Sequence, residues 1–390
     1  MRRVAAAIAA GGAMVLTACS DPALLETNRP APSAPGHHAP AAAAAPPPAP
    51  VSEPLRTGER FVDVTLPVAY TPTAEGPGTD DYRCFVLDPG LQRDSLVAGV
   101  DILPDNPTLV HHVIVHKVDP DRVVEALALE AAAPDPGYSC FGGSGLESSP
   151  GDGLDRATWV GAWAPGGGER VLDEDLGIPL PQGSRLVIQM HYSLLGGPGS
   201  DRSTVRLRVA DDDGTKRSLE TMLLPAPVEL PCRQRNQGGL CVRDRAVHDV
   251  VERFGDAGRT GDRLHFLCGP AAPGPTQSCT RDVHEVGTVR AVSGHMHLLG
   301  AAMTIAVNAG TPSERRLLDI PVWDFDDQGA VPLEEPVRVA PGDTLTVTCT
   351  HDQALRDRLP AFDGVPERYV VWGEGTTDEM CLGIVLLTRP

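Results

Sequence analysis

Positive charge is scarce in this sequence. Its 390 residues include 33 Lys and Arg against 52 Asp and Glu, which gives a formal net charge of −19 at pH 7 with histidine neutral. Proteins that bind nucleic acid present an excess of Lys and Arg to the phosphates. The composition therefore argues against nucleic acid as a partner.

Long hydrophobic runs are missing beyond the first residues. The start, MRRVAAAIAAGGAMVLTACS, has two arginines, an apolar stretch too short for a stable membrane helix, and small residues ending at Cys19. Leu16–Cys19 (LTAC) resembles the bacterial lipobox, whose cysteine is lipidated. We expect a lipoprotein signal peptide over residues 1–18, with an ordinary signal peptide cut nearby as the alternative. The chain would be exported and held at the bacterial cell envelope, on its periplasmic face or at the cell surface, through the lipid on Cys19 alone.

No C-x-x-C pair occurs, so neither a zinc ribbon nor a thioredoxin-like site is indicated. Besides Cys19 the chain has an even number of cysteines, and disulfides are the default in an exported protein. Spacing alone leaves the pairing of the eight open. They are Cys84, Cys140, Cys232, Cys241, Cys268, Cys279, Cys349 and Cys381.

Proline and alanine dominate residues 30–54, and we interpret residues 19–57 as a disordered tether in which His37 and His38 are solvated. Short β-rich runs then recur between turn signals. We predict an all-β fold of two antiparallel, jelly-roll-like β-sandwich domains in tandem, over residues 58–216 and 217–390. Asp121–Ala133 is the one convincing helical window.

Histidines interrupt the β-branched run Pro107–Val118, PTLVHHVIVHKV. Successive side chains of a strand point to opposite faces, so the adjacent His111 and His112 should not meet. They could share one metal ion only at a twisted or bulged strand end, through different ring nitrogens. The alternative is a half-buried strand with polar ends.

Two further segments carry potential metal ligands. His295 and His297 are separated by one residue, so a strand presents both on one face, either to a metal ion or to solvent. His191, in LVIQMHYS, would on its own be a core histidine. Met380, directly before Cys381, would on its own be core filler.

These motifs occur together and in order: DYRCFVLD, LVHHVIVHKV, GAWAPGG, LVIQMHYS, GHMHLLG, APGDTLTVTCTHD and DEMCLG. From Asp80 to Gly383 the chain resembles the type II copper, ascorbate-dependent monooxygenases, which include the peptide-amidating and dopamine-hydroxylating enzymes. The resemblance implies two coppers per chain. One site would be formed by His111, His112 and His191, and the other by His295, His297 and Met380.

The resemblance also implies an activity, the hydroxylation of an aliphatic C–H bond of a small molecule by O2. The His-His-Met copper would activate O2, the three-His copper would supply the second electron, and ascorbate or a similar donor would reload both. The ligand types agree independently, because two imidazoles and a thioether favour Cu(I). The alternative is a non-catalytic copper-binding or copper-sensing surface lipoprotein. We expect a monomer.

Other residues near these motifs are assigned less directly. Gln189 matches a glutamine of the peptide-amidating members and would steady the three-His site, or it is a solvent-facing strand residue. His116 shares a face with His112 in an ideal strand, but the resemblance favours His111 as the ligand. His351 has no ligand counterpart, and we expect it in a surface turn.

By resemblance, Cys84 pairs with Cys140 and Cys349 with Cys381. Proximity alone suggests Cys232 with Cys241 and Cys268 with Cys279. The peptide-amidating members hold their peptide with an arginine and a tyrosine at positions where this chain has Ser293 and Ile384. Peptide amidation is therefore not expected, and the substrate is left open.

Overall fold

Strands are the main regular structure of the described residues, as predicted. The structure, a computed structural model, describes residues 52–74, 79–146, 156–164, 167–233, 238–325 and 327–390. All of them belong to the unit Pro50–Pro390, which separates from Met1–Ala49. Cys19, His37 and His38 lie outside the described residues, so the lipidation site and most of the tether stay predictions.

The first β-sandwich contains the strands of the His-His run and of His191. One sheet has the order β5 (Tyr138–Ser139), β2 (Asp80–Leu87), β10 (Arg185–Ser193), β4 (Val110–Val118) and β7 (Trp159–Trp163). The facing strands are β1 (Glu59–Thr65), β11 (Thr204–Asp211), β3 (Ser95–Leu103) and β9 (Leu176–Leu180), with β8 (Arg170–Val171) on β3.

Apolar side chains at alternate strand positions build the core between these sheets. On β11, Val205, Leu207 and Val209 are fully buried at alternate positions. They join Val113 of β4 and Ile188 of β10 in one cluster. The strands that carry His111, His112 and His191 are therefore fixed by packing on their core side.

The second sandwich carries His295, His297 and Met380. One sheet has β12 (Arg217–Pro225), β21 (Leu382–Thr388), β15 (Gly287–His295) and β18 (Val331–Val339), with β6 (Arg156–Ala157) on β12. The other has β14 (Thr276–Asp282), β19 (Thr344–His351), β16 (Gly300–Val307) and β17 (Arg315–Ile320), and a separate pair is β13 (Glu229–Leu230) with β20 (Val370–Val371).

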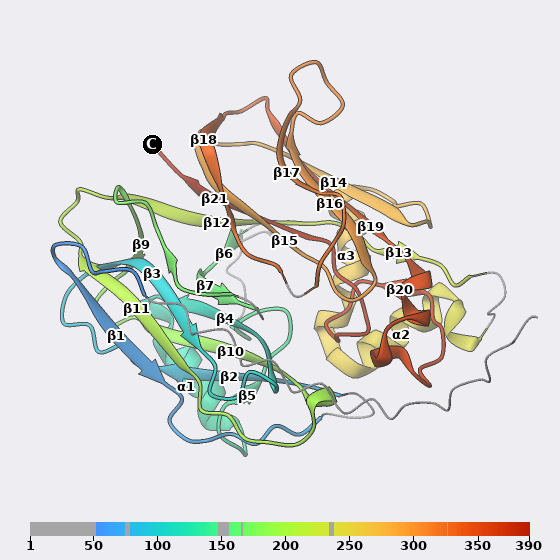
Figure 1. Cartoon of the computed structure of the whole chain (residues 1–390), viewed down its shortest axis with the longest axis horizontal. Helices are drawn as coiled ribbons and strands as arrows, with labels where there is room; N and C mark the ends of the chain where they lie inside the picture. The colour runs from blue at the N-terminus through green and yellow to red at the C-terminus, as the bar shows by residue number, and fades with distance from the viewer. Residues whose placement is uncertain (1–51, 75–78, 147–155, 165–166, 234–237, 326) are drawn as a thin grey trace, which may run out of the picture. The chain divides into compact units, whose positions relative to one another are not determined.

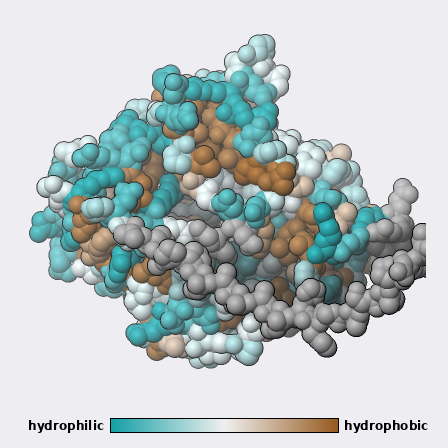
Figure 2. Space-filling view, viewed as in Figure 1, coloured by the Kyte–Doolittle hydropathy of each residue, from teal (hydrophilic) through white to brown (hydrophobic). Residues whose placement is uncertain are grey.

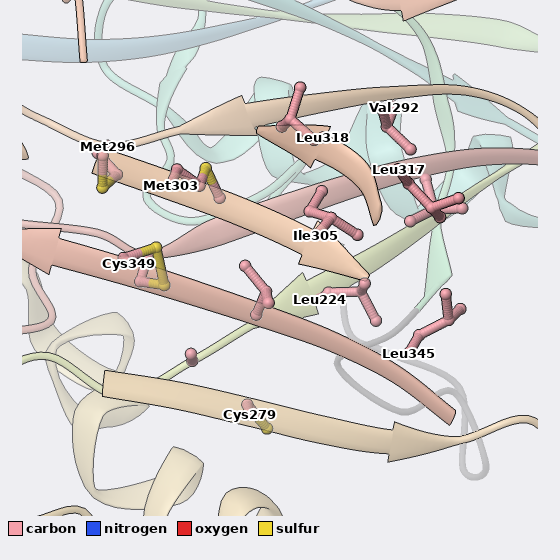
Figure 3. Packing of buried hydrophobic residues seen from close by; sticks show 14 of the residues in the cluster. Leu224, Cys279, Val292, Met296, Met303, Ile305, Leu317, Leu318, Leu345 and Cys349 are labelled. Carbon is pink, nitrogen blue, oxygen red and sulfur yellow. A yellow bond between two sulfur atoms is a disulfide. The ribbon is translucent and has the colours of Figure 1, made fainter. Parts of the chain in front are cut away.

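Figure 3 shows the core of this second sandwich. Leu224 of β12 and Val292 of β15 pack with Ile305 of β16 and Leu345 of β19, and all four are at most 2% exposed. Because these side chains come from both sheets, they hold β15 in place, and β15 ends at His295.

One sheet passes through both halves of the chain. Strand β12 pairs with β9 in parallel, through Arg217 with Leu176 and Ser218 with Gly177, so a continuous sheet runs from β1 to β18 (Figure 1). The predicted change of domain at residues 216 and 217 falls at the start of β12. This boundary stays a prediction.

The helices differ from the prediction. The window Asp121–Ala133 forms α1 (Val123–Ala132), as predicted, but α2 (Arg243–Phe254) and α3 (Thr260–Cys268) were not predicted. In the described part of the chain no helix is long and apolar enough to cross a membrane. Leu264 of α3 packs in a cluster with Met380. A missed helix therefore supports the segment that carries a proposed ligand.

All four predicted cysteine pairs are disulfides in the structure. They are Cys84 with Cys140, Cys232 with Cys241, Cys268 with Cys279, and Cys349 with Cys381. The last joins β19 to the residue that follows Met380.

Hydrophobic surface gathers over the second sandwich (Figure 2). Val322 and Val331 are exposed apolar side chains, with 80% and 48% of their surface accessible. Val322 lies in the β17–β18 connection, which also carries Phe325 and Gln328, and Val331 begins β18.

Candidate metal centre

A β-bulge brings the adjacent histidines of β4 to one place. In the pairing of β4 with β10, His191 lies opposite His112, but the next residue, Tyr192, lies opposite Val110. His111 is the extra residue, and a bulge of this kind re-aims side chains that would otherwise alternate. The bulge that a shared metal ion would require is therefore present.

Three ring nitrogens converge at this bulge. The Nδ1 atom of His111 lies 3.4 Å from Nδ1 of His112 and 3.1 Å from Nδ1 of His191, and the Nδ1 atoms of His112 and His191 are 3.2 Å apart. The expectation that the adjacent histidines use different ring nitrogens is therefore wrong. The bulge turns both rings so that the same atom faces the centre.

This triangle has the dimensions of a metal site. Imidazole nitrogens bind metal ions such as zinc at about 2.0–2.1 Å, and near-tetrahedral angles at the ion then place two ligand nitrogens about 3.3 Å apart. Among the described residues these three histidines form a group whose ligand atoms all lie within 4.8 Å of one another. The residues fit a metal ion.

Burial keeps the three imidazoles neutral. It lowers the pKa of His111 to about 4 and the pKa values of His112 and His191 well below the ordinary value. Neighbouring histidines lower these pKa values further, because protonated imidazoles would repel one another. Lone pairs are thus available to a metal at neutral pH.

Asp80 orients the His191 ring, and sequence reasoning missed this residue. Nε2 of His191 lies 2.8 Å from Oδ1 of Asp80, so the Nε2–H donates to the carboxylate and Nδ1 keeps its lone pair. Thr376 donates to the same oxygen at 2.6 Å. Asp80 begins β2, opposite Ser193 at the end of β10, and only the strand register reveals its place.

Tyr82 covers one face of the His191 ring. Its ring stacks on His191 at 4.0 Å between centroids, and its hydroxyl donates to the carbonyl of Glu374 at 2.5 Å. Together with the bond from Thr376 to Asp80, this ties the three-His group to residues 374–376, a few residues before Met380.

The second group lies where β15 ends. The rings of His295 and His297 are 5.1 Å apart between centroids, and burial lowers the pKa of both. Gln328 donates from Nε2 to the Phe325 carbonyl at 2.7 Å, which directs its Oε1 at Nδ1 of His295, 2.6 Å away. His295 therefore carries its proton on Nδ1, and Nε2 offers a lone pair. Gln328 was not predicted, because it lies in a connection far from the motif.

Met380 lies on the segment beside these histidines. It is 8% exposed and packs with Leu264, Trp372 and Leu382, and Leu382 is the strand partner of His295. Its part as a third ligand stays a prediction. A set of two imidazoles and a thioether would fit Cu(I).

The two histidine groups adjoin. The rings of His112 and His295 are 5.8 Å apart between centroids, and Phe325 packs on His111 at 4.9 Å. One connection, between β17 and β18, thus contacts the first group through Phe325 and the second through Gln328.

The three remaining candidates, Gln189, His116 and His351, are all buried. Gln189 is 2% exposed and donates to the Gly143 carbonyl at 2.6 Å, so the solvent-facing alternative is wrong and its role beside the three histidines stays a prediction. His116 is buried apart from the group, with Nδ1 3.3 Å from the Thr158 hydroxyl. The expected surface turn at His351 is also wrong, because this residue ends β19, is 1% exposed, and lies 3.2 Å from the Met380 carbonyl.

The positions that differ from the peptide-amidating enzymes face each other. Ser293 of β15 lies opposite Ile384 of β21, next to His295. The Ser293 hydroxyl lies 3.1 Å from the Gln328 carbonyl and 3.3 Å from that of Gly329. Neither side chain offers a cation to a peptide carboxylate.

Several solved structures show weak likenesses to this chain. An allantoicase covers 75% of this chain and 86% of its own, with 9% identity and a TM-score of 0.18. A fucolectin from striped bass (Morone saxatilis) serum covers 80% and 84%, with 8% identity and a TM-score of 0.17. The VP2 subviral particle of infectious bursal disease virus covers 88% and 75%, with 10% identity and a TM-score of 0.18. We draw nothing from these values.

No curated protein matches the chain. A family model does match part of it, over residues 275–387, a range that includes His295, His297 and Met380. This part of the chain matches the C-terminal domain of the copper type II ascorbate-dependent monooxygenases.

Proposed function

We propose that the protein is a copper monooxygenase that hydroxylates an aliphatic C–H bond of a small substrate. The overall change is R–H + O2 + 2e⁻ + 2H⁺ → R–OH + H2O, with ascorbate or another one-electron donor supplying the electrons. The observation that carries the proposal is the triangle of three Nδ1 atoms beside a second histidine pair that lies within the matched domain.

The division of labour follows from the donor atoms. His111, His112 and His191 would hold one copper through three neutral nitrogens, and His295, His297 and Met380 would hold the other through two nitrogens and a sulfur. Bound copper would supply the O2 activation and one-electron chemistry that side chains lack.

The protein's own residues prepare these sites. Asp80 holds the proton of His191 on Nε2, and Gln328 holds that of His295 on Nδ1, so each ring presents one defined nitrogen. Burial keeps the rings neutral. Ser293 and Ile384, which lie opposite each other near His295, carry no charge that could bind a substrate carboxylate.

Location is part of the proposal. Export with lipidation at Cys19 would place a monomer at the bacterial cell envelope, where an oxidising environment maintains the four disulfides. The mass of the mature N-terminal peptide tests this, because lipidation at Cys19 adds acyl groups and ordinary cleavage does not.

Copper titration followed by an activity assay tests the function. Apo-protein is titrated anaerobically with copper, oxidised and read by paramagnetic resonance, and O2 uptake with ascorbate is then measured across a panel of small substrates. We expect two coppers per chain and a hydroxylated product, with zinc-loaded protein as the inactive control. Two coppers without substrate-dependent O2 uptake or product would instead favour a copper-binding or copper-sensing lipoprotein.

A further inference from the structure

Glu379, directly before Met380, is buried at 0% exposure. One carboxylate oxygen accepts the backbone N–H of His297 at 3.0 Å, and the other accepts the backbone N–H of Leu299 at 2.5 Å. A carboxylate that leaves water needs such partners, and both of these N–H groups belong to the turn that follows β15. The side chain next to one proposed ligand therefore binds the main chain of another.

His351 adds a third element to this contact. From the end of β19, its Nε2 lies 3.2 Å from the Met380 carbonyl and 3.4 Å from a carboxylate oxygen of Glu379. The Cys349–Cys381 disulfide lies two residues before His351 and one residue after Met380. Strand β19 thus supports the main chain on both sides of the Met380 side chain.

We infer that Glu379, supported by His351, is a positioning residue. It would hold Met380 and His297 in the arrangement in which both can bind one copper. The inference rests on the proposed His-His-Met site. A thioether is a weak ligand, so its contribution depends on how far it must be ordered when the metal binds. Glu379 would perform this ordering in the folded protein, because its two bonds fix the distance between the turn of His297 and the main chain of Met380.

Glu379→Gln tests the inference with little change of shape. The amide keeps one carbonyl oxygen but turns an NH2 group toward one of the two N–H donors. One of the two hydrogen bonds to the turn that follows β15 is therefore lost. Glu374→Gln is the matched control, because Glu374 is a buried carboxyl on the same segment whose side chain does not bind this turn. Cu(I) affinity is measured anaerobically at each site by chelator competition, and sulfur ligation by X-ray absorption.

For Glu379→Gln we expect Cu(I) to bind the second site about 10–100-fold more weakly, with reduced sulfur scattering and an unchanged first site. Glu374→Gln should match wild type in all three measurements. If Glu379→Gln is not folded by near-ultraviolet circular dichroism, His351→Leu replaces it and should weaken the second site in the same direction.

Two results would overturn the inference in distinguishable ways. Wild-type affinity and sulfur scattering in a folded Glu379→Gln or His351→Leu protein would overturn the positioning role alone. Absence of sulfur scattering in wild-type protein would overturn the His-His-Met site and the positioning role together.

Discussion

The buried His191 and the partly buried Asp80 form an imidazole–carboxylate pair, with Nε2 of the ring 2.8 Å from Oδ1 of the acid. The same oxygen accepts the hydroxyl of Thr376, which lies four residues before Met380. The pair therefore sets the tautomer of a candidate ligand of the first group and also contacts the segment that carries a candidate ligand of the second.

Asp80→Asn should weaken copper binding at the three-His site by about 10–100-fold, because a neutral amide supports the His191 Nε2–H less well than a carboxylate. The second site should keep its affinity. Copper content after dialysis against a graded chelator, with the paramagnetic resonance signal of each site, measures both. Thr376→Val removes the other bond to Asp80 without touching His191, and its effect should be smaller. Equal copper retention by Asp80→Asn and wild type would contradict the assigned role.

His112→Ala should lose one copper and keep the other, because it removes one corner of the triangle of nitrogens. His116→Ala is the control on the same strand, buried but outside that triangle. It should bind two coppers even if the cavity lowers the free energy of unfolding. Metal analysis of the folded proteins measures the stoichiometry. Loss of a copper from His116→Ala alone would show that the ligands are wrongly assigned.

The sequence predicted the strands and the ligand candidates better than it predicted their surroundings. The alternating Val205, Leu207 and Val209 of β11 and the histidine spacings are local patterns, so the sequence alone shows them. The bulge at His111 was predicted only as a condition for a shared ion, and the ring nitrogens were wrong because a bulge changes side-chain direction in a way that spacing does not encode.

Residues that support the ligands were missed for a physical reason. Asp80 depends on the register of β2 with β10, and Gln328 on the path of a connection. These two contacts are long-range, and no local pattern in a single sequence specifies them. Helix α2 is different, because its buried Ala246 and Val250 lie four positions apart on one face, a helical spacing that the sequence does contain.

Acid should destabilise the apo-protein between about pH 6.5 and pH 4. Burial lowers the pKa values of His111 and His116 to about 4, so the unfolded chain binds protons in this window that the folded chain does not. The contribution of these two neutral histidines to the free energy of unfolding is therefore complete above about pH 6.5, and it is lost as the pH falls toward 4. Urea unfolding across this range measures it. His116→Leu should flatten the profile, whereas replacement of the exposed His248 should not.

Glu374 should make the protein less stable as the pH rises, which is the opposite of the effect of the histidines. Burial, and then the charge of Asp378, raise the pKa of its carboxyl to about 7 from an ordinary 4.5. The folded protein therefore holds a proton that the unfolded chain releases between these values, and stability falls as the pH rises through the window. Glu374→Gln removes this loss, so between pH 5 and pH 8 it should gain up to about 3 kcal/mol relative to wild type. A difference that does not change with pH would show that the carboxyl is ionised throughout.

Met380→Leu tests the mechanism most directly. Leucine keeps much of the volume in the cluster with Leu264 and Trp372, so packing should cost less than about 1.5 kcal/mol and the domain should fold. His295 and His297 remain, but without the soft sulfur the site should lose its preference for Cu(I). We expect near-normal copper at the three-His site, weaker Cu(I) binding at the second, and loss of ascorbate-driven O2 uptake. If the variant formed product as fast as wild type, Met380 would be a packing residue, and the proposed monooxygenase would lose its most specific ligand.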